Sequence, residues 1–357
     1  MKIEKSEIAS KLAKLKSIIP AKPSIECLKG VLVKNGTLTA YNLEVALRCK
    51  VDCDQGEAYI LPQRAIELIE NLPDGEVEIT SEEKGESTAV IITTETIANR
   101  FQTFPAGDYP EIPEVDEGAH TSISSDSLQE VIGSIMYAAG VNCTKTQMNG
   151  LYFDGDGESL NLVTCDGYRI AWAKLPHTEQ MKMIVPRATV QSLLSMGLSG
   201  SVSIRYDQRQ AIFQTEEYIM YSRLLEGEFV NYRKAFPNHT NNVVIDRRSF
   251  LDSIKRASIC GEEKSRPMVI LELEADYMTI KTKSSLGEYV ESLKMDSSIE
   301  EKVRISFNAR YLLDCIKSYS CVGLSCSFGG TKMPMVVDDG DVKALVLPVR
   351  ISEEAAE

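Results

Sequence analysis

The chain contains 357 residues, of which 43% are hydrophobic and 25% are charged, and it carries a formal net charge of −13 at pH 7. These values are typical of a globular protein with two or three domains, and they exclude a chain that is disordered throughout. The acidic balance excludes a surface that is basic overall, but it leaves room for a local basic surface that binds nucleic acid.

The N-terminal segment predicts neither secretion nor membrane insertion. Residues 1–7 are charged, unlike a signal peptide, and no apolar run approaches the roughly 18 residues of a membrane span. Nine cysteines occur without a Cys-x-x-Cys pair, which argues against a zinc site and favours free thiols in a reducing compartment. We therefore expect a cytoplasmic protein that has no metal ion and no cofactor.

An amphipathic helix is expected near the start of each third of the chain. The apolar positions of the first helix, predicted over residues 6–19, are Ile8, Leu12, Leu15 and Ile19. They fall on one helical face. The segments 125–135 and 247–257 show the same spacing. Helices that recur in this way indicate that the chain repeats itself.

Each of these helices is followed by two short apolar stretches that are separated by a turn rich in Asn, Gly or Asp. Such a pattern is typical of a β-hairpin. The six predicted strands are 30–33 and 38–40, 150–153 and 160–163, and 269–273 and 278–280.

A strand that runs through a polar or proline turn into a second helix also occurs three times. The turn residues Pro62, Pro186 and Asn308 lie 124 and 122 positions apart. Each of these helices is followed by an alternating stretch, as expected of a strand with one buried face. A repeat of this length is a whole domain. We therefore predict an α+β protein with three domains, 1–118, 119–241 and 242–357, each with two helices packed on antiparallel sheets.

The sequence lacks the common catalytic motifs. There is no Gly-x-Ser-x-Gly, no Walker A loop and no Gly-x-Gly-x-x-Gly. The Cys165-Asp166 pair could be a nucleophile with an orienting acid, or Cys165 could be a packing residue at a strand end. A binding or scaffold role is favoured, and an enzyme that uses Cys165 or a pair of carboxylates is kept as an alternative.

Basic residues are concentrated in the predicted helices, whereas acidic residues gather in loops such as 111–117. The second helix of each repeat begins at or near an arginine, namely Arg64, Arg187 and Arg310. Two interpretations are open: these are ordinary solvated helix faces, or the helices share one surface that faces phosphate.

Several runs in this sequence closely resemble the bacterial sliding clamp family, the β subunit of DNA polymerase III. The matching runs are Tyr41–Glu44, Asn149–Phe153, Leu162–Ala171, Ile184–Arg187, Glu226–Pro237 and Leu345–Ile351. The resemblance extends from about Met1 to Ile351. It implies three clamp-type domains per chain and two chains joined head to tail in a ring, with helices lining the hole.

The function that this resemblance implies is that of a processivity factor, not an enzyme. The ring would encircle duplex DNA and tether the replicative polymerase, and it would slide because it reads phosphate and not bases. The implied partners are DNA of any sequence, the polymerase catalytic subunit, the clamp loader, other clamp-binding replication and repair proteins, and a second copy of the chain, with no membrane. A peptide-binding scaffold that does not encircle DNA is the alternative.

The resemblance also implies residues for DNA contact and for the ring interface. The expected DNA-binding residues are Lys22, Lys145, Thr146, Gln147 and Arg187. The residues expected at the dimer interface are Phe101, Ile259 and Cys260.

A groove for partner peptides is implied between the second and third domains. Its matching positions are Met148, Cys165, Gly167, Tyr168, Arg169, Ile170, Val230, Lys234, Ala235, Met333, Leu345, Val346, Leu347, Pro348, Val349, Arg350 and Ile351. Apolar members would form the floor, and Arg169, Lys234 and Arg350 would place charge at the rim. The alternative is that the C-terminal residues form only an edge strand.

Overall fold

The structure is a computed structural model that describes residues 1–51, 58–84, 87–115, 118–261, 267–285, 287–299 and 302–350. By its internal contacts the chain divides into two compact units. The N-terminal unit comprises Met1–Leu128 and Ala188–Leu224, and the C-terminal unit comprises Gln129–Arg187 and Leu225–Glu357. Of the nine cysteines, Cys53 lies outside the described residues, and so does Ile351 among the predicted groove positions.

The N-terminal unit contains two antiparallel sheets. The four-stranded sheet has the order β1 (Lys2–Glu4), β6 (Glu76–Lys84), β7 (Ser87–Thr93) and β8 (Ala98–Thr103). The eight-stranded sheet has the order β5 (Tyr59–Leu61), β2 (Val31–Lys34), β3 (Thr37–Tyr41), β4 (Val45–Lys50), β16 (Tyr218–Arg223), β15 (Gln210–Gln214), β14 (Ser201–Tyr206) and β9 (Ala119–Ser124). The pair β4–β16 therefore joins the first third of the chain to the second.

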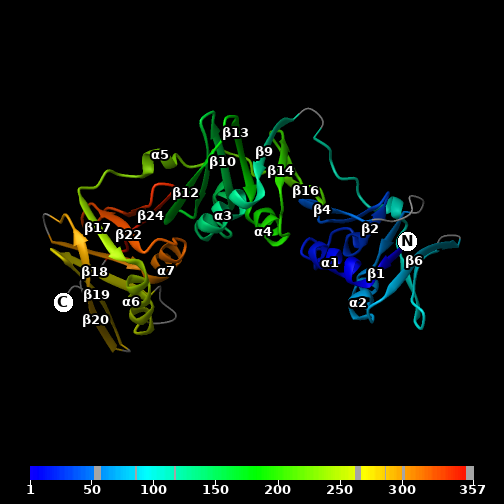
Figure 1. Cartoon of the computed structure of the whole chain (residues 1–357), viewed down its shortest axis with the longest axis horizontal. Helices are drawn as coiled ribbons and strands as arrows, with labels where there is room; N and C mark the ends of the chain where they lie inside the picture. Colours follow the sequence, from blue (N-terminus) through cyan, green and yellow to red (C-terminus); the bar gives the residue numbers. More distant parts are fainter. Residues whose placement is uncertain are drawn as a thin grey trace. The chain divides into compact units, whose positions relative to one another are not determined.

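Helices α1 (Lys5–Lys16) and α2 (Gln63–Asn71) pack side by side in this unit, and α1 also contacts β3 and β4 (Figure 1). The stripe predicted for the first helix is confirmed, because Ile8, Leu12 and Leu15 are fully buried. The end of the stripe differs from the prediction. Since α1 ends at Lys16, Ile18 is the next buried residue, and Ile19 is only half-buried.

The C-terminal unit is built on one twelve-stranded antiparallel sheet. Its order is β13 (Gln180–Pro186), β10 (Gly150–Asp156), β11 (Ser159–Cys165), β12 (Arg169–Pro176), β24 (Val342–Val346), β23 (Met335–Asp338), β22 (Gly323–Phe328), β17 (Asn241–Asp246), β20 (Gly287–Ser297), β19 (Tyr277–Ser284), β18 (Met268–Glu274) and β21 (Val303–Asn308). The pair β12–β24 joins the second third of the chain to the last.

Helices α6 (Arg247–Ile259) and α7 (Ala309–Lys317) lie against each other in the C-terminal unit (Figure 1). They bury a core around Phe250, Phe307 and Phe328, each fully inaccessible to solvent. The remaining helices are α3 (Ser125–Ile135), α4 (Arg187–Ser195) and the short α5 (Tyr232–Ala235). No helix in the part of the chain that is described is long and apolar enough to cross a membrane.

The predicted α+β class is confirmed, and so is the threefold strand–turn–helix unit. Strand β5 runs through Pro62 into α2, β13 ends at Pro186 directly before α4, and β21 ends at Asn308 directly before α7. The Asn308 side chain caps α7, because its Oδ1 accepts a hydrogen bond from the backbone N–H of Arg310 at 2.9 Å. One turn type thus starts a helix in each third of the chain.

Candidate partner-binding surface

The pairing of β12 with β24 brings together segments that lie far apart in the sequence. Ile170 on β12 is paired with Leu345 on β24 and with Cys165 on β11. These three side chains are buried in one apolar cluster with Val163 and Tyr232. They form the floor of what we call the β12–β24 surface, which further comprises Met148, residues 166–169, 229–236 and 345–350, and Met333.

Large apolar side chains stand exposed on this surface. Tyr168, Met333, Leu347 and Val349 are between 38% and 47% exposed. The backbone N–H of Leu347 donates to the carbonyl of Tyr168 at 2.9 Å, so these two residues are neighbours. Val349 is held in turn by Ser306, whose carbonyl accepts from its backbone N–H at 2.8 Å. Clustered apolar exposure of this kind is typical of a protein-binding site.

The turn between β11 and β12 orients Tyr168. Asp166 Oδ1 accepts hydrogen bonds from the backbone N–H groups of Tyr168 at 2.9 Å and Arg169 at 3.0 Å. Gly167 between them has a φ of +89°, which a side chain would disfavour. The Tyr168 ring stacks on Tyr311 with centroids 5.9 Å apart. The Asp-Gly-Tyr sequence therefore presents an aromatic ring at the strand start.

The guanidinium of Arg169 is already paired, which differs from the free rim charge that the resemblance implied. Its Nε donates to Asp166 at 2.9 Å, its Nη1 donates to Asp314 at 2.7 Å, and it lies 4.5 Å from the Tyr311 ring centroid. Burial would lower the pKa of Arg169, but the hydrogen bonds to Asp314 and Asp166 outweigh it and raise this pKa. Arg169 therefore ties the start of β12 to helix α7.

The segment around α5 is fastened to β10 by a polar cluster. The Tyr232 hydroxyl donates to Asp154 Oδ2 at 2.6 Å, and Arg233 Nη2 donates to the same oxygen at 2.9 Å and to Asp156 at 3.2 Å. Burial and the hydrogen bond to Asp154 raise the pKa of Tyr232. Trp172 packs edge-on against Tyr232, with ring centroids 5.0 Å apart. These contacts fix the positions of residues 229–236, which lie between β16 and β17.

The remaining predicted groove positions fall on or beside this frame. Met148 and Val230 are half-buried and pack against the apolar cluster, and Val346 is fully buried in β24. Exposed positions are Gly167, Lys234, Ala235 and Arg350, and Pro348 is half-buried. Met333 lies two residues before Met335, which pairs with Val346. The prediction for Ile351 concerns a residue outside those that the structure describes.

Cys165 has the environment of a packing residue. It is 3% exposed, and burial, as the largest influence, raises the pKa of its thiol. A neutral buried thiol is a poor nucleophile, because the thiolate is the reactive form. Within the described part of the chain, no cluster of His, Cys, Asp and Glu residues is able to hold a metal ion.

The residues expected to contact DNA differ in their exposure to solvent and in their hydrogen bonds. Lys22 is exposed in the loop that follows α1, and Lys145 and Thr146 are exposed beside the half-buried Gln147. The loop before Gln147 is closed by Asn149, whose Oδ1 accepts from the backbone N–H of Cys143 at 2.8 Å. These loops offer polar side chains to solvent.

Arg187 has a structural role that the sequence did not reveal. Its Nη1 donates to the backbone carbonyls of Ala139 at 2.6 Å and Met136 at 3.2 Å, just beyond the end of α3. Burial lowers the pKa of Arg187. By contrast, Arg64 and Arg310, which have similar places in the repeat, are exposed.

The residues expected at the dimer interface lie on an edge strand and at the end of a helix. Phe101 is half-buried on β8, the edge strand of the four-stranded sheet, beside a cavity of ≈ 450 Å³ that Arg100 and Phe104 also line. Ile259 ends α6 and is 78% exposed, and Cys260 follows it half-buried.

Three family profiles match the chain one after another. The profile of the DNA polymerase III beta subunit N-terminal domain matches residues 1–113, that of the central domain matches 122–231, and that of the C-terminal domain matches 233–350.

The chain belongs to the DNA polymerase III beta subunit family. The beta sliding clamp of Vibrio cholerae is 26% identical to it over 369 residues, with 98% of this chain and 99% of the relative covered. That of Bacillus subtilis is 25% identical and covers 84% and 82% of the two chains. The resemblance seen in the sequence is confirmed.

Solved structures of this family share the fold. The sliding clamp from Bacillus subtilis has a TM-score of 0.91 at 22% identity, covering 98% of this chain and 99% of that one. The beta subunit from Thermotoga maritima has a TM-score of 0.88 at 24% identity with the same coverage.

Several residues that support the β12–β24 surface in this beta-subunit family member were not found by sequence reasoning. Asp154, Tyr311 and Asp314 form its polar frame, and the bond from Tyr232 to Asp154 spans 78 positions. Tyr232 and Arg233 lay within the run Glu226–Pro237 that carried the resemblance, so a signal existed for these two residues alone.

Proposed function

We propose that this chain forms the DNA sliding clamp of a replicative polymerase, as a homodimeric ring that encircles duplex DNA. The observation that carries the proposal is the match of all three beta-subunit domains in order along one chain. The ring would act by topology and not by turnover, in the cytoplasm where DNA and polymerase meet. Its three clamp domains would be 1–118, 119–241 and 242–357.

The β12–β24 surface would serve as the groove for peptide segments of partner proteins. These partners would be the polymerase catalytic subunit, the clamp loader, and other replication and repair proteins. Apolar anchors of such a peptide would pack on Leu347, Val349 and Tyr168, which are exposed above a buried floor. Lys234 and Arg350, both exposed, would supply positive charge at the rim.

Contacts with DNA would be made to phosphates without reading of base sequence. Lys22 and Lys145 are exposed cations in loops, and Thr146 and Gln147 add polar groups beside Lys145. A few such contacts let a ring slide while topology retains it. Arg187 would support the geometry of the central domain, because its guanidinium is committed to backbone carbonyls.

The ring would close by pairing of the edge strand β8 and Phe101 with the region around Ile259 of a second copy. An exposed strand edge and an isoleucine that is 78% exposed are liabilities in a monomer, and burial against a partner removes them. Val290 on β20, 65% exposed, adds apolar surface in the same unit as Ile259.

The test is retention on circular DNA. Protein loaded by a clamp loader onto nicked circular DNA should stay bound during gel filtration, and it should be lost after the circle is cut at one site. Equal loss from both substrates would contradict encirclement. Sedimentation distinguishes the alternative, because a monomer at micromolar concentration would favour a scaffold that does not encircle DNA.

The variant Ile259→Asp tests the interface. A carboxylate placed in an apolar contact costs several kcal/mol, so the dissociation constant of the dimer should rise by tenfold or more. Val322→Asp, a substitution at another protruding apolar residue (82% exposed), is the matched control and should leave the dimer intact.

A further inference from the structure

A cavity of ≈ 170 Å³ lies in the N-terminal unit where β4 pairs with β16, and the function proposed above does not use it. Its floor is a row of cross-strand neighbours on four adjacent strands, namely Ala46, Tyr221, Ile212 and Arg205. The first three are buried, so the floor is firm and mostly apolar.

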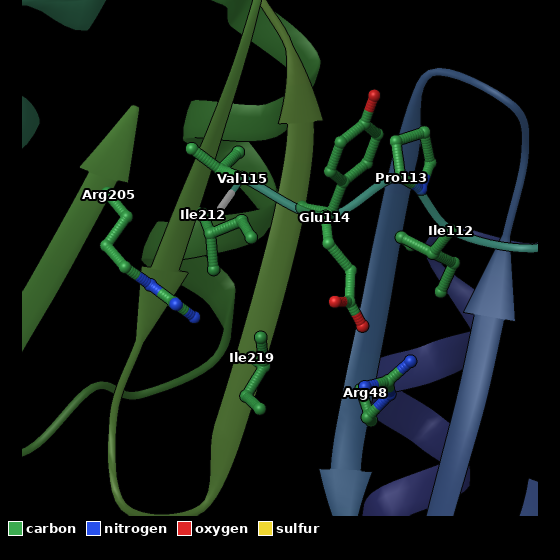
Figure 2. A pocket seen from close by; sticks show the side chains of 10 residues that line it. Arg48, Ile112, Pro113, Glu114, Val115, Arg205, Ile212 and Ile219 are labelled. Atoms are coloured by element: carbon green, nitrogen blue, oxygen red, sulfur yellow. The ribbon is translucent and has the colours of Figure 1, made fainter. Parts of the chain in front are cut away.

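The linker 112–115 crosses these strands and closes the cavity on one side (Figure 2). Val115 is buried in the same apolar cluster as Tyr221. Gln210 fixes the linker, because its Nε2 donates to the carbonyl of Glu114 at 3.2 Å while its Oε1 accepts from the Tyr221 hydroxyl at 3.0 Å. The walls are therefore held in place without a ligand, as is typical of binding sites.

The cavity carries an excess of positive charge. Arg48 on β4 and Arg205 on β14 line it together with a single acid, Glu114, so the lining has two guanidinium groups and one carboxylate. Figure 2 shows the Glu114 side chain extending toward Arg48, while Arg205 reaches from β14 alongside Ile212. Arg205 is exposed and is thus accessible to an anion from solvent.

The size and the chemistry of the lining point to one class of ligand. An apolar cavity of about 150 Å³ holds a benzene molecule, so this one fits a single branched aliphatic or aromatic group. Arginine binds carboxylates through paired hydrogen bonds. We infer that this cavity binds a carboxylate that bears one such apolar group, with the group against Ile212 and Ile219 and the carboxylate on Arg205.

Two sources present this chemistry: a small free carboxylic acid, and the C-terminal residue of a peptide with an apolar side chain. The probes are therefore isocaproate and phenylacetate, their neutral amides, and acetyl-Gly-Leu with a free or amidated C-terminus. Binding is measured on the full chain with labelled isoleucine methyl groups, because Ile112, Ile212 and Ile219 all line the cavity.

The expected result is a saturable shift of these three methyl signals and not of the buried Ile305 and Ile316 in the C-terminal unit. The acids should bind at least about tenfold more tightly than their amides, since a hydrogen-bonded charge is lost in the amide. Tighter binding of acetyl-Gly-Leu than of isocaproate would assign a peptide C-terminus, and equal binding would assign a free acid; the site stands in both cases.

Two variants should act in opposite directions. Arg205→Gln should weaken binding of isocaproate about tenfold, and Glu114→Gln should strengthen it, because a competing carboxylate is removed. Arg209→Gln, at an exposed arginine in the turn before β15, is the matched control and should change nothing. Equal affinity for acid and amide, or an affinity that Arg205→Gln leaves unchanged, would overturn the inference. Because no step of this test needs a ring or DNA, its result is separate from that of the clamp assay.

Discussion

The junctions β4–β16 and β12–β24 are built alike but leave different surfaces open. In each, an antiparallel strand pair joins one third of the chain to the next. A linker, 112–115 in the first and 229–236 in the second, packs apolar residues on the sheet. At β4–β16 the linker buries Tyr109 and Val115 and leaves a small cavity. At β12–β24 the chain continues past the strand into exposed Leu347 and Val349. The two junctions therefore share a frame and differ in which apolar side chains they leave exposed.

The two linkers are also held in place by different kinds of contact. The first relies on one neutral contact set, in which Gln210 bridges Tyr221 and the Glu114 carbonyl. The second relies on charge, because Asp154 accepts hydrogen bonds from both Tyr232 and Arg233. Charge-assisted hydrogen bonds are stronger and more directional. The segment 229–236 is therefore held more rigidly than the linker 112–115.

The largest effect is expected from placing negative charge on the exposed apolar residues of the β12–β24 junction. The double variant Leu347→Asp/Val349→Asp should weaken binding of a labelled C-terminal peptide from the polymerase about 1,000-fold, because anchor contacts are worth about 2 kcal/mol or more each and about 1.4 kcal/mol is tenfold. Fluorescence anisotropy measures the affinity. Val141→Asp, at a residue that is 68% exposed, is the control. Tight binding by the double variant would show that this junction isn't the groove.

The second largest effect is expected at the polar cluster that fastens residues 229–236 to β10. Asp154→Ala leaves Tyr232 and Arg233 without their shared acceptor and should cost about 2 kcal/mol of unfolding free energy. Peptide affinity should fall with it, because the linker loses its position. Urea unfolding and anisotropy measure the two effects. Asp156→Ala keeps the acceptor that Tyr232 and Arg233 share. It removes the exposed Arg233 contact and the turn hydrogen bonds from Glu158 and Ser159, so peptide affinity should fall less than in Asp154→Ala.

The equivalent change at the β4–β16 junction should lower the stability of the protein without changing peptide binding. Gln210→Ala removes the bridge to Tyr221 and Glu114 and should destabilise the protein by about 1 kcal/mol. Peptide affinity at β12–β24 should stay unchanged. A fall in affinity comparable to that of Asp154→Ala would contradict the view that the two junctions work independently.

The smallest effect is a pH dependence at the second junction. The backbone N–H groups of Ser159 and Glu158 donate to Asp156 and hold the pKa of its carboxyl well below the usual range. A folded-state pKa below the unfolded value stabilises the protein at neutral pH, and this contribution is lost as the pH falls below about 4. Unfolding curves of the wild type and Asp156→Asn should therefore converge in acid. A gap that persists in acid would contradict this origin.

Much of the architecture could be predicted because it is encoded locally. Apolar spacing identified α1 through Ile8, Leu12 and Leu15, and the turns at Pro62, Pro186 and Asn308 identified the threefold unit. Hydrophobic periodicity and turn chemistry depend on near neighbours in the sequence, so a single sequence contains them. The same locality explains an error: where α1 ends decides whether Ile18 or Ile19 is buried.

The partners of individual charges were decided only by the tertiary structure. Arg187 and Arg169 each read as a free cation in the sequence, yet one donates to carbonyls 48 and 51 positions away and the other to Asp314, 145 positions away. A charged side chain binds whatever the fold brings within about 3 Å, and no local pattern records that distance. The sequence by itself thus determined the repeated α+β frame and its family. Long-range packing decided which of its charges and apolar side chains remain free to bind a partner.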